Sequence, residues 1–195
     1  MEIIIHRINK IDELRKINKK NGVEIDIRSF GSELILNHGP FIQGDRLEDY
    51  LDEYNHGTLV LNIKEAGIEE NVISLIKMRP KIKSYFLLDV EFPYLYNSSI
   101  KGNKNLAVRF SEFESIRTVE KFINKIDWVW IDTFSTLPIT KKNKNILNGF
   151  KKCIVCPERW GREEDINKYK IQIKKLNIHI DAVMTSFKTV QTWIE

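Results

Sequence analysis

The sequence predicts an α/β fold, and within that class a compact (β/α)8 or TIM barrel. Three observations lead to this prediction: short runs of branched apolar residues recur along the chain, segments with helical periodicity separate them, and most of the runs end on polar residues. Parallel strands need long crossover connections, which are usually helices, so this alternation favours a parallel sheet. The chain has 195 residues, fewer than the ~250 that are typical of such barrels. We expect one domain over residues 1–195.

The predicted strands are recognised by runs of Ile, Val, Leu, Phe and Trp. They lie at residues 2–7, 23–28, 57–64, 84–90, 105–111, 127–134, 151–157 and 181–186. The predicted helices are recognised by apolar residues spaced three or four apart. They lie at residues 10–20, 46–54, 68–78, 112–125, 139–148, 163–177 and 187–194. Three helix starts are indicated by residues typical of N-caps, namely Asp45, Ser111 with Glu114, and Thr140.

Residues 29–44 depart from this alternation. Ser29–Ser32 has the composition of a turn, and Glu33–His38 has that of a short additional strand. We expect this strand to fold back onto residues 23–28, which would place His38 beside the end of that strand.

Composition excludes several classes of protein. Lys and Arg number 31 against 27 Asp and Glu, a net charge of +4, and the two signs are interspersed, so a nucleic-acid partner is not indicated. No apolar run approaches the ~20 residues of a membrane span. We expect a cytoplasmic protein with a small-molecule partner. Cys153 and Cys156 lie within an apolar strand-like run, at a spacing that points them to opposite faces, and we expect buried thiols there.

Two carboxylates alternate with branched apolar residues in the run Val23–Arg28. Strand side chains alternate between faces, so Glu24 and Asp26 project from one side. Such a pattern is also typical of an exposed edge strand with a solvated face. In a parallel sheet that is covered on both sides, however, two carboxylates need partners. The pattern therefore predicts a site for a hard divalent cation, magnesium or calcium, that could polarise a phosphate.

Polar residues gather at the C-terminal ends of the predicted strands, which is the edge where barrel enzymes carry their sites. Four of them are expected at the mouth of the barrel: Asp89, Arg109, Trp130 and Asp132. Arg109 is equally consistent with an ion pair to Glu24 or Asp132 in the core. Trp130 forms either a wall for a sugar or glycerol group or a part of the core.

Three motifs within the first 64 residues carry a family resemblance. His6–Arg7, Gly22–Ile27 and Leu34–His38 resemble the signature of the glycerophosphodiester phosphodiesterases, a branch of the phosphatidylinositol-phospholipase-C-like barrel superfamily. Leu61–Lys64 is similar to the Glu-x-Lys motif on that family's third strand. Beyond residue 64 the similarity is architectural.

The resemblance implies a metal-dependent phosphoric diester hydrolase. Its substrate would be a small glycerophosphodiester or a related sugar-linked diester, cleaved by two histidines that act as acid and base. By position in the motifs, His6 and His38 would be that pair, and Arg7 and Lys64 would bind the phosphate. This division is chemically coherent, because a phosphodiester needs positive charge at its nonbridging oxygens and a proton for its leaving oxygen.

The implied metal ligands are Glu24 and Asp26, with Asn62 at the place of a third acidic ligand. The sequence departs from the family at this position, and also where Ile8 replaces a glycine and Gly39 replaces an aspartate. An amide oxygen can still bind magnesium or calcium, but with one charge fewer the metal would be held more weakly.

These departures support an alternative function. A barrel that keeps the phosphate-binding residues but has lost hydrolysis would bind phosphorylated ligands. A third interpretation, a lyase or isomerase with Lys64 as base, leaves the two histidines without a role.

Overall fold

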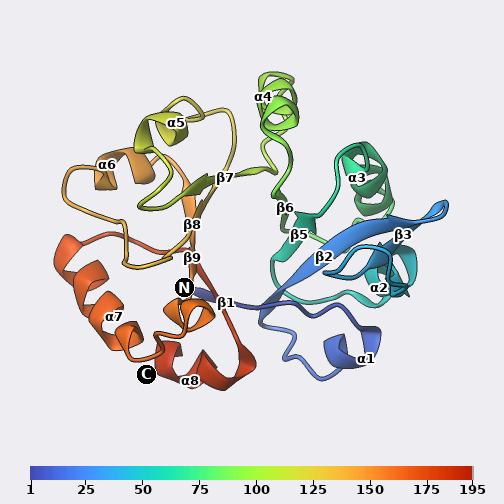
Figure 1. Ribbon diagram of the computed structural model, residues 1–195, viewed down its shortest axis with the longest axis horizontal. Helices are drawn as coiled ribbons and strands as arrows, with labels where there is room; N and C mark the ends of the chain where they lie inside the picture. The colour runs from blue at the N-terminus through green and yellow to red at the C-terminus, as the bar shows by residue number, and fades with distance from the viewer. Residues whose placement is uncertain (195) are drawn as a thin grey trace. The chain divides into compact units, whose positions relative to one another are not determined.

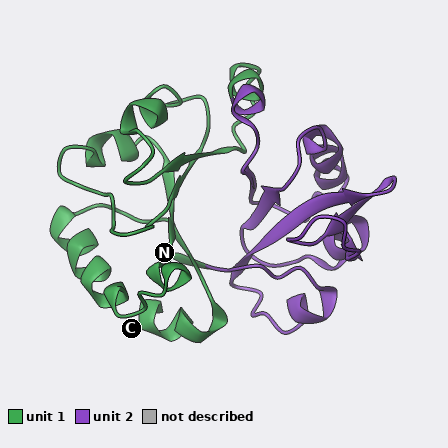
Figure 2. Ribbon diagram, in the orientation of Figure 1, with its two compact units in different colours: residues 1–3, 96–195 green, residues 4–95 purple. Residues whose placement is uncertain are grey.

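The computed structural model describes residues 1–194. Contacts divide the chain into two compact units, which Figure 2 distinguishes by colour: an N-terminal unit of residues 4–95, and a C-terminal unit of residues 1–3 together with residues 96 onward. No helix among the described residues is long and apolar enough to cross a membrane. The expectation of a single domain stays a prediction.

The N-terminal unit is built on a mostly parallel sheet (Figure 1). Its strands are β1 (Glu2–Ile5), which enters this unit at Ile4, β2 (Gly22–Phe30), β3 (Glu33–Leu36), β4 (Asp45–Arg46), β5 (Leu59–Ile63) and β6 (Tyr85–Leu88). Its helices are α1 (Ile11–Leu14), α2 (Leu47–Glu53) and α3 (Glu69–Lys77). The strands β1, β2, β5 and β6 are parallel neighbours in that order. The antiparallel strands β3 and β4 extend from β2.

The C-terminal unit contains four parallel strands in the order β7, β8, β9, β10. These strands are β7 (Ala107–Phe110), β8 (Trp128–Ile131), β9 (Lys151–Val155) and β10 (Ala182–Thr185). The helices are α5 (Ile116–Glu120), α6 (Lys144–Leu147), α7 (Asp165–Leu176), α8 (Val190–Ile194) and the 3-10 turns η1 (Pro157–Trp160) and η2 (Phe187–Thr189). The helix α4 (Phe92–Ile100) begins in the N-terminal unit and ends in the C-terminal one.

The predicted fold class is confirmed. In the described part of the chain strands alternate with helices, the pairing is mostly parallel, and each of the eight predicted strands is present.

Strand β2 positions the carboxylates as its sequence predicts. Val23, Ile25 and Ile27 are fully buried on one face, where each contributes roughly 1.5–3 kcal/mol to folding. On the opposite face Glu24 and Asp26 are 2% and 1% exposed. Because β2 pairs with strands on both sides, it is not an edge strand with a solvated face. Its two carboxylates must therefore have polar partners.

The predicted additional strand is β3, which folds back on β2 as an antiparallel hairpin. Ile27 pairs with Leu36, and Phe30 pairs with Glu33. The turn includes Gly31 at a φ of 63°, a conformation that glycine adopts at little cost. The hairpin register brings the residues after β3, including His38, back to the middle of β2.

Several helices differ from their predicted bounds. The segment 10–20 forms only the four-residue helix α1. Asp45 does not cap α2; it lies in β4, and its Oδ2 accepts a hydrogen bond from the backbone N–H of Ile11 at 2.7 Å, where α1 begins. Sequence spacing around Asp45 indicated a local cap, whereas the observed partner is 34 residues away in the chain.

Two further differences concern α5 and α4. The helix α5 starts after Ser115, whose hydroxyl accepts a hydrogen bond from the N–H of Arg117 at 3.2 Å, so the predicted cap at Ser111 is wrong. The helix α4 was not predicted, because Phe92–Ile100 is rich in aromatic residues and serines, which have modest helix propensity.

Candidate active site

The site begins where β1 ends, at His6 and Arg7. Arg7 adopts a left-handed backbone conformation with a φ of 54°, which a non-glycine residue takes up at a cost of about 1–3 kcal/mol. Its backbone N–H donates to Glu24 Oε2 at 2.8 Å, and the next N–H, of Ile8, donates to the Glu24 carbonyl at 2.9 Å. These bonds hold the strained residue against β2 and turn its guanidinium toward the carboxylates.

The Glu24 carboxylate is buried and contacts an amide, a backbone N–H and an imidazole. Its Oε1 accepts from Asn62 Nδ2 at 2.8 Å, and the imidazole of His6 lies with Nε2 3.8 Å from Oε2. Burial and the nearby negative charge of Asp26 raise the pKa of Glu24 to about 7. Glu24 is therefore close to the balance between its charged and neutral forms near neutral pH.

The Asp26 carboxylate is surrounded by donors. Its Oδ1 lies 3.2 Å from both His38 Nδ1 and Lys64 Nζ. Its Oδ2 accepts from Asn9 Nδ2 at 2.9 Å and forms an ion pair with Arg7 Nε at 3.3 Å. Although burial opposes ionisation, the hydrogen bond from Asn9 and the positive charge of Lys64 outweigh it and lower the pKa of Asp26 below its usual range. Asp26 is therefore charged at neutral pH.

His38 is held between Asp26 and Arg7. One guanidinium nitrogen of Arg7 lies 3.3 Å from His38 Nε2. A guanidinium can only donate, so Nε2 is the acceptor in this contact and Nδ1 carries the hydrogen that points to Asp26. The imidazole is about half exposed. This arrangement turns one ring nitrogen toward the guanidinium of Arg7 and the other toward the carboxylate of Asp26.

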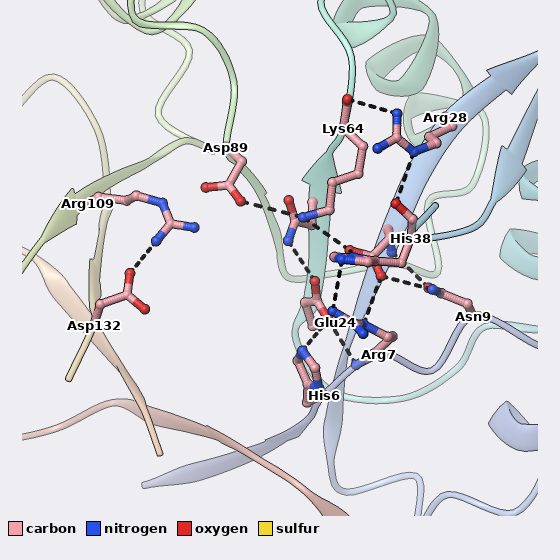
Figure 3. A network of polar contacts seen from close by, with 12 residues as sticks. His6, Arg7, Asn9, Glu24, Arg28, His38, Lys64, Asp89, Arg109 and Asp132 are labelled. Atoms are coloured by element: carbon pink, nitrogen blue, oxygen red, sulfur yellow. Dashed lines mark hydrogen bonds and ion pairs between the residues drawn. The ribbon is translucent and has the colours of Figure 1, made fainter. Parts of the chain in front are cut away.

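Lys64 follows the end of β5 and places a second cation in the cluster. Its ammonium lies 3.2 Å from Asp26 Oδ1 and 3.6 Å from Asp89 Oδ2. Asp89 follows the end of β6 with a φ of 59°, so both Arg7 and Asp89 place strained backbone at strand ends. Figure 3 shows His6, Arg7, Glu24, His38, Lys64 and Asp89 converging in one network.

Two residues outside the predicted site support it. Asn9 makes two bonds to Asp26, since its amide donates to the carboxylate and its Oδ1 accepts from the backbone N–H at 2.8 Å. Arg28 donates from Nε to the His38 carbonyl at 3.1 Å and from a terminal nitrogen to the Lys64 carbonyl at 3.2 Å (Figure 3). Arg28 therefore ties the backbone of His38 to the backbone of Lys64.

Three of the predicted mouth residues lie in the C-terminal unit. Arg109 forms an ion pair with Asp132, one of the two alternatives that the sequence left open. Trp130 is 3% exposed on β8.

Cys153 and Cys156 are free and buried, as predicted.

The predicted metal ligands do not fit a divalent cation well. No group of three or more His, Cys, Asp or Glu side chains in the described chain is placed to hold a metal ion. Asn62 presents an N–H to Glu24 where a third carboxylate would be needed, and the cations Arg7 and Lys64 already face Asp26. A hard cation prefers several anionic oxygens that are free to coordinate it.

The raised pKa of Glu24 predicts a pH dependence of stability. Between its usual value of 4.5 and about 7, the folded protein keeps a proton that the unfolded chain releases. The contribution of Glu24 to the free energy of unfolding therefore falls as the pH rises through this window and is constant above it. Glu24→Gln should remove this fall, since the new amide stays neutral. The buried Oδ1 of Asn62 has no partner among the described residues, and rotation of its amide would let it accept from the new side chain.

Urea unfolding of both proteins at pH 5 and pH 8 checks this prediction. His56, whose pKa is lowered by burial, contributes the opposite slope equally to both proteins, so the difference between them reports Glu24. An identical change of stability with pH in the two proteins would contradict the assignment.

Comparison with known proteins supports the fold. No protein-family model matches the chain, and no curated protein matches its sequence. Its structure is similar to a glycerophosphodiester phosphodiesterase from Agrobacterium tumefaciens, with a TM-score of 0.64 and 11% identity over 94% of this chain and 96% of the other. It is also similar to an Oleispira antarctica phosphodiesterase solved with the product sn-glycerol-3-phosphate, with a TM-score of 0.64 and 16% identity over 100% and 96% of the two chains. The chain therefore shares the TIM-barrel fold of the glycerophosphodiester phosphodiesterases.

Proposed function

We propose that this protein cleaves a small phosphodiester, such as a glycerophosphodiester or a related sugar-linked diester, with His38 as general base and His6 as general acid. The observation that carries the proposal is the chain of contacts from Asp26 to His38 to Arg7. It orients a basic nitrogen next to a guanidinium that can bind a phosphate oxygen. The product named for the Oleispira phosphodiesterase, sn-glycerol-3-phosphate, is consistent with this substrate class.

In this proposal Arg7 and Lys64 bind the phosphate. Both are cations at the C-terminal ends of parallel strands, and each faces Asp26. When the two nonbridging oxygens of a diester bind these groups, Arg7 turns its donors from His38 Nε2 to the phosphate. The base then becomes available to the attacking oxygen.

Proton transfer follows from the surroundings of the two histidines. His38 Nε2 takes the proton of the attacking hydroxyl group while a new bond forms between that oxygen and phosphorus. The charge on the imidazolium is stabilised by Asp26 at 3.2 Å from Nδ1. His6, whose Nε2 lies 3.8 Å from Glu24 Oε2, gives a proton to the leaving oxygen as its bond to phosphorus breaks. The attacking hydroxyl belongs either to water or to the substrate alcohol next to the ester, in which case a cyclic phosphate forms first.

A chromogenic diester tests this proposal. The purified protein should release p-nitrophenol from bis(p-nitrophenyl) phosphate, and His38→Ala should release it at a rate near the uncatalysed background. Absence of turnover, together with binding of phosphate esters that Lys64→Met weakens, would instead establish the alternative function, a barrel that binds phosphorylated ligands. The presence of Asn62 in place of a third acidic residue is the observation that favours this alternative.

A further inference from the structure

We infer that Lys64 and Arg7 supply the positive charge that the diester needs, and that Glu24, Asp26 and Asn62 do not hold a divalent cation. This inference rests on the proposed function, because it concerns how the same cluster binds its substrate. It is drawn from the donors that surround the two carboxylates and from the identity of residue 62.

All four oxygens of the two carboxylates have donors. Those of Glu24 accept from the Asn62 amide and from the Arg7 backbone N–H, each at 2.8 Å. Those of Asp26 face the donors of Asn9, Arg7, His38 and Lys64 at distances of 2.9–3.3 Å. A cation could bind these oxygens only by displacing such donors, of which Arg7 and Lys64 are charged and Asn62 is buried. Ligand exchange of this kind opposes metal binding.

Residue 62 decides the charge of the cluster. Asn62 lies on β5 directly opposite Asp26 in the parallel register, and its side chain reaches Glu24. A carboxylate at this position would add a third negative charge beside two others, and a divalent cation would then be needed to offset it. The amide instead donates an N–H to Glu24, and the two cations Arg7 and Lys64 both face Asp26.

Lys64 and Arg7 have further N–H donors that can bind an anion. An ammonium has three N–H donors, and Lys64 Nζ lies 3.2 Å from Asp26 Oδ1, whereas Asp89 Oδ2 at 3.6 Å is an ion-pair partner beyond hydrogen-bond distance. A guanidinium has five; one nitrogen of Arg7 contacts His38 Nε2, and Nε forms an ion pair with Asp26 without a hydrogen bond. The remaining donors can bind both nonbridging oxygens of a diester without a metal.

Direct titration of metal tests the inference independently of turnover. Calorimetric titration of the wild-type protein with magnesium, calcium or manganese should show no saturable binding tighter than about 1 mM that depends on Asp26. Binding that persists in Asp26→Asn belongs elsewhere on the protein and agrees with the inference. Saturable binding that is lost in Asp26→Asn would overturn it.

A gain of metal binding provides the complementary test. Asn62→Glu should create a site whose metal binding is at least tenfold tighter than in the wild type, and metal should raise its thermal unfolding midpoint. The wild-type titration decides the question if this variant does not fold. An Asn62→Glu protein that folds without metal and gains no affinity for it would contradict the role given to residue 62.

Anion binding in chelator tests the role of the two cations. The wild-type protein should bind sn-glycerol 3-phosphate equally well in EDTA and in magnesium. Lys64→Met should weaken this binding about tenfold or more, whereas Lys77→Met, which removes an exposed charge from α3, should leave it unchanged. A requirement for magnesium in binding would overturn the inference.

The outcomes separate this inference from the proposed function. Turnover that is abolished by EDTA and restored by metal would keep the phosphodiesterase and overturn metal independence. Absence of turnover with and without metal, combined with phosphate binding in EDTA, would overturn the phosphodiesterase and keep the metal-free site.

Discussion

Replacing His38 with alanine is expected to lower turnover of a glycerophosphodiester on the order of 10²–10⁴-fold, the range typical for the loss of a general base. The reason is structural: Asp26 and Arg7 hold this imidazole with Nε2 beside the guanidinium that we propose binds the phosphate. His6→Ala is expected to cause a loss of similar size through the missing acid. His179→Ala is the matched control, because that imidazole is 74% exposed and belongs to the C-terminal unit.

The two histidine variants should differ on an activated substrate. p-Nitrophenolate is a good leaving group that needs little protonation, so His6→Ala should recover most of its activity on bis(p-nitrophenyl) phosphate. His38→Ala should not recover, since the attacking oxygen still has to lose its proton. Steady-state rates on activated and unactivated diesters measure this difference. Equal losses of both variants on both substrates would refute the division of roles.

Asp26→Asn is expected to have the second large effect, because it changes activity and stability together. The variant loses the acceptor that orients His38 and the charge that balances Lys64 and Arg7. We expect kcat to fall on the order of 10²–10⁴-fold, as for other carboxylates that support a catalytic imidazole. The free energy of unfolding should fall by about 3 kcal/mol, at the lower end for a broken buried ion pair because Arg7 is 37% exposed.

Urea unfolding at neutral pH and kinetics on the folded fraction separate these two effects. Asp12→Asn is a suitable control, since that carboxylate is 82% exposed and its ion pair with Arg15 lies outside the cluster. A stable Asp26→Asn protein with nearly full kcat would show that Asp26 neither orients the base nor balances the cations.

The strand β2 and its hairpin could be predicted because their residues alternate between apolar and polar and are followed by a turn composition. Strict alternation in Val23–Arg28 fixed which side chains of β2 share a face, and the turn composition of Ser29–Ser32 indicated the hairpin. Prediction failed for α4 because its residues are poor helix formers, so tertiary packing outweighs local propensity there. It also failed for Asp45, whose partner at the start of α1 cannot be found from local spacing.

The sequence predicted which residues form most of the candidate site, but it did not predict which atoms they contact. The motifs placed His6, Arg7, Glu24 and Lys64 on parallel strands and His38 on an additional strand that folds back, and the structure brings them together. Asn9 and Arg28 were not predicted as members of the site, because their function depends on bonds to residues 10 to 36 positions away. The sequence also predicted an oxygen ligand at Asn62, whereas the side chain donates its N–H to Glu24. The Oδ1 of the same amide is buried without a hydrogen-bond partner among the described residues, and the sequence could not show which of the two amide atoms would face Glu24.

Phosphorus NMR of a glycerophosphodiester incubated with the purified protein tests the central claim most directly. In samples with EDTA and in samples with magnesium, the diester resonance should disappear and a phosphate monoester should accumulate, either directly or through a cyclic phosphate. The double variant His6→Ala with His38→Ala should leave the diester intact in both. A wild-type protein that leaves the diester unchanged in both samples would contradict the assignment of this cluster as a phosphodiesterase site.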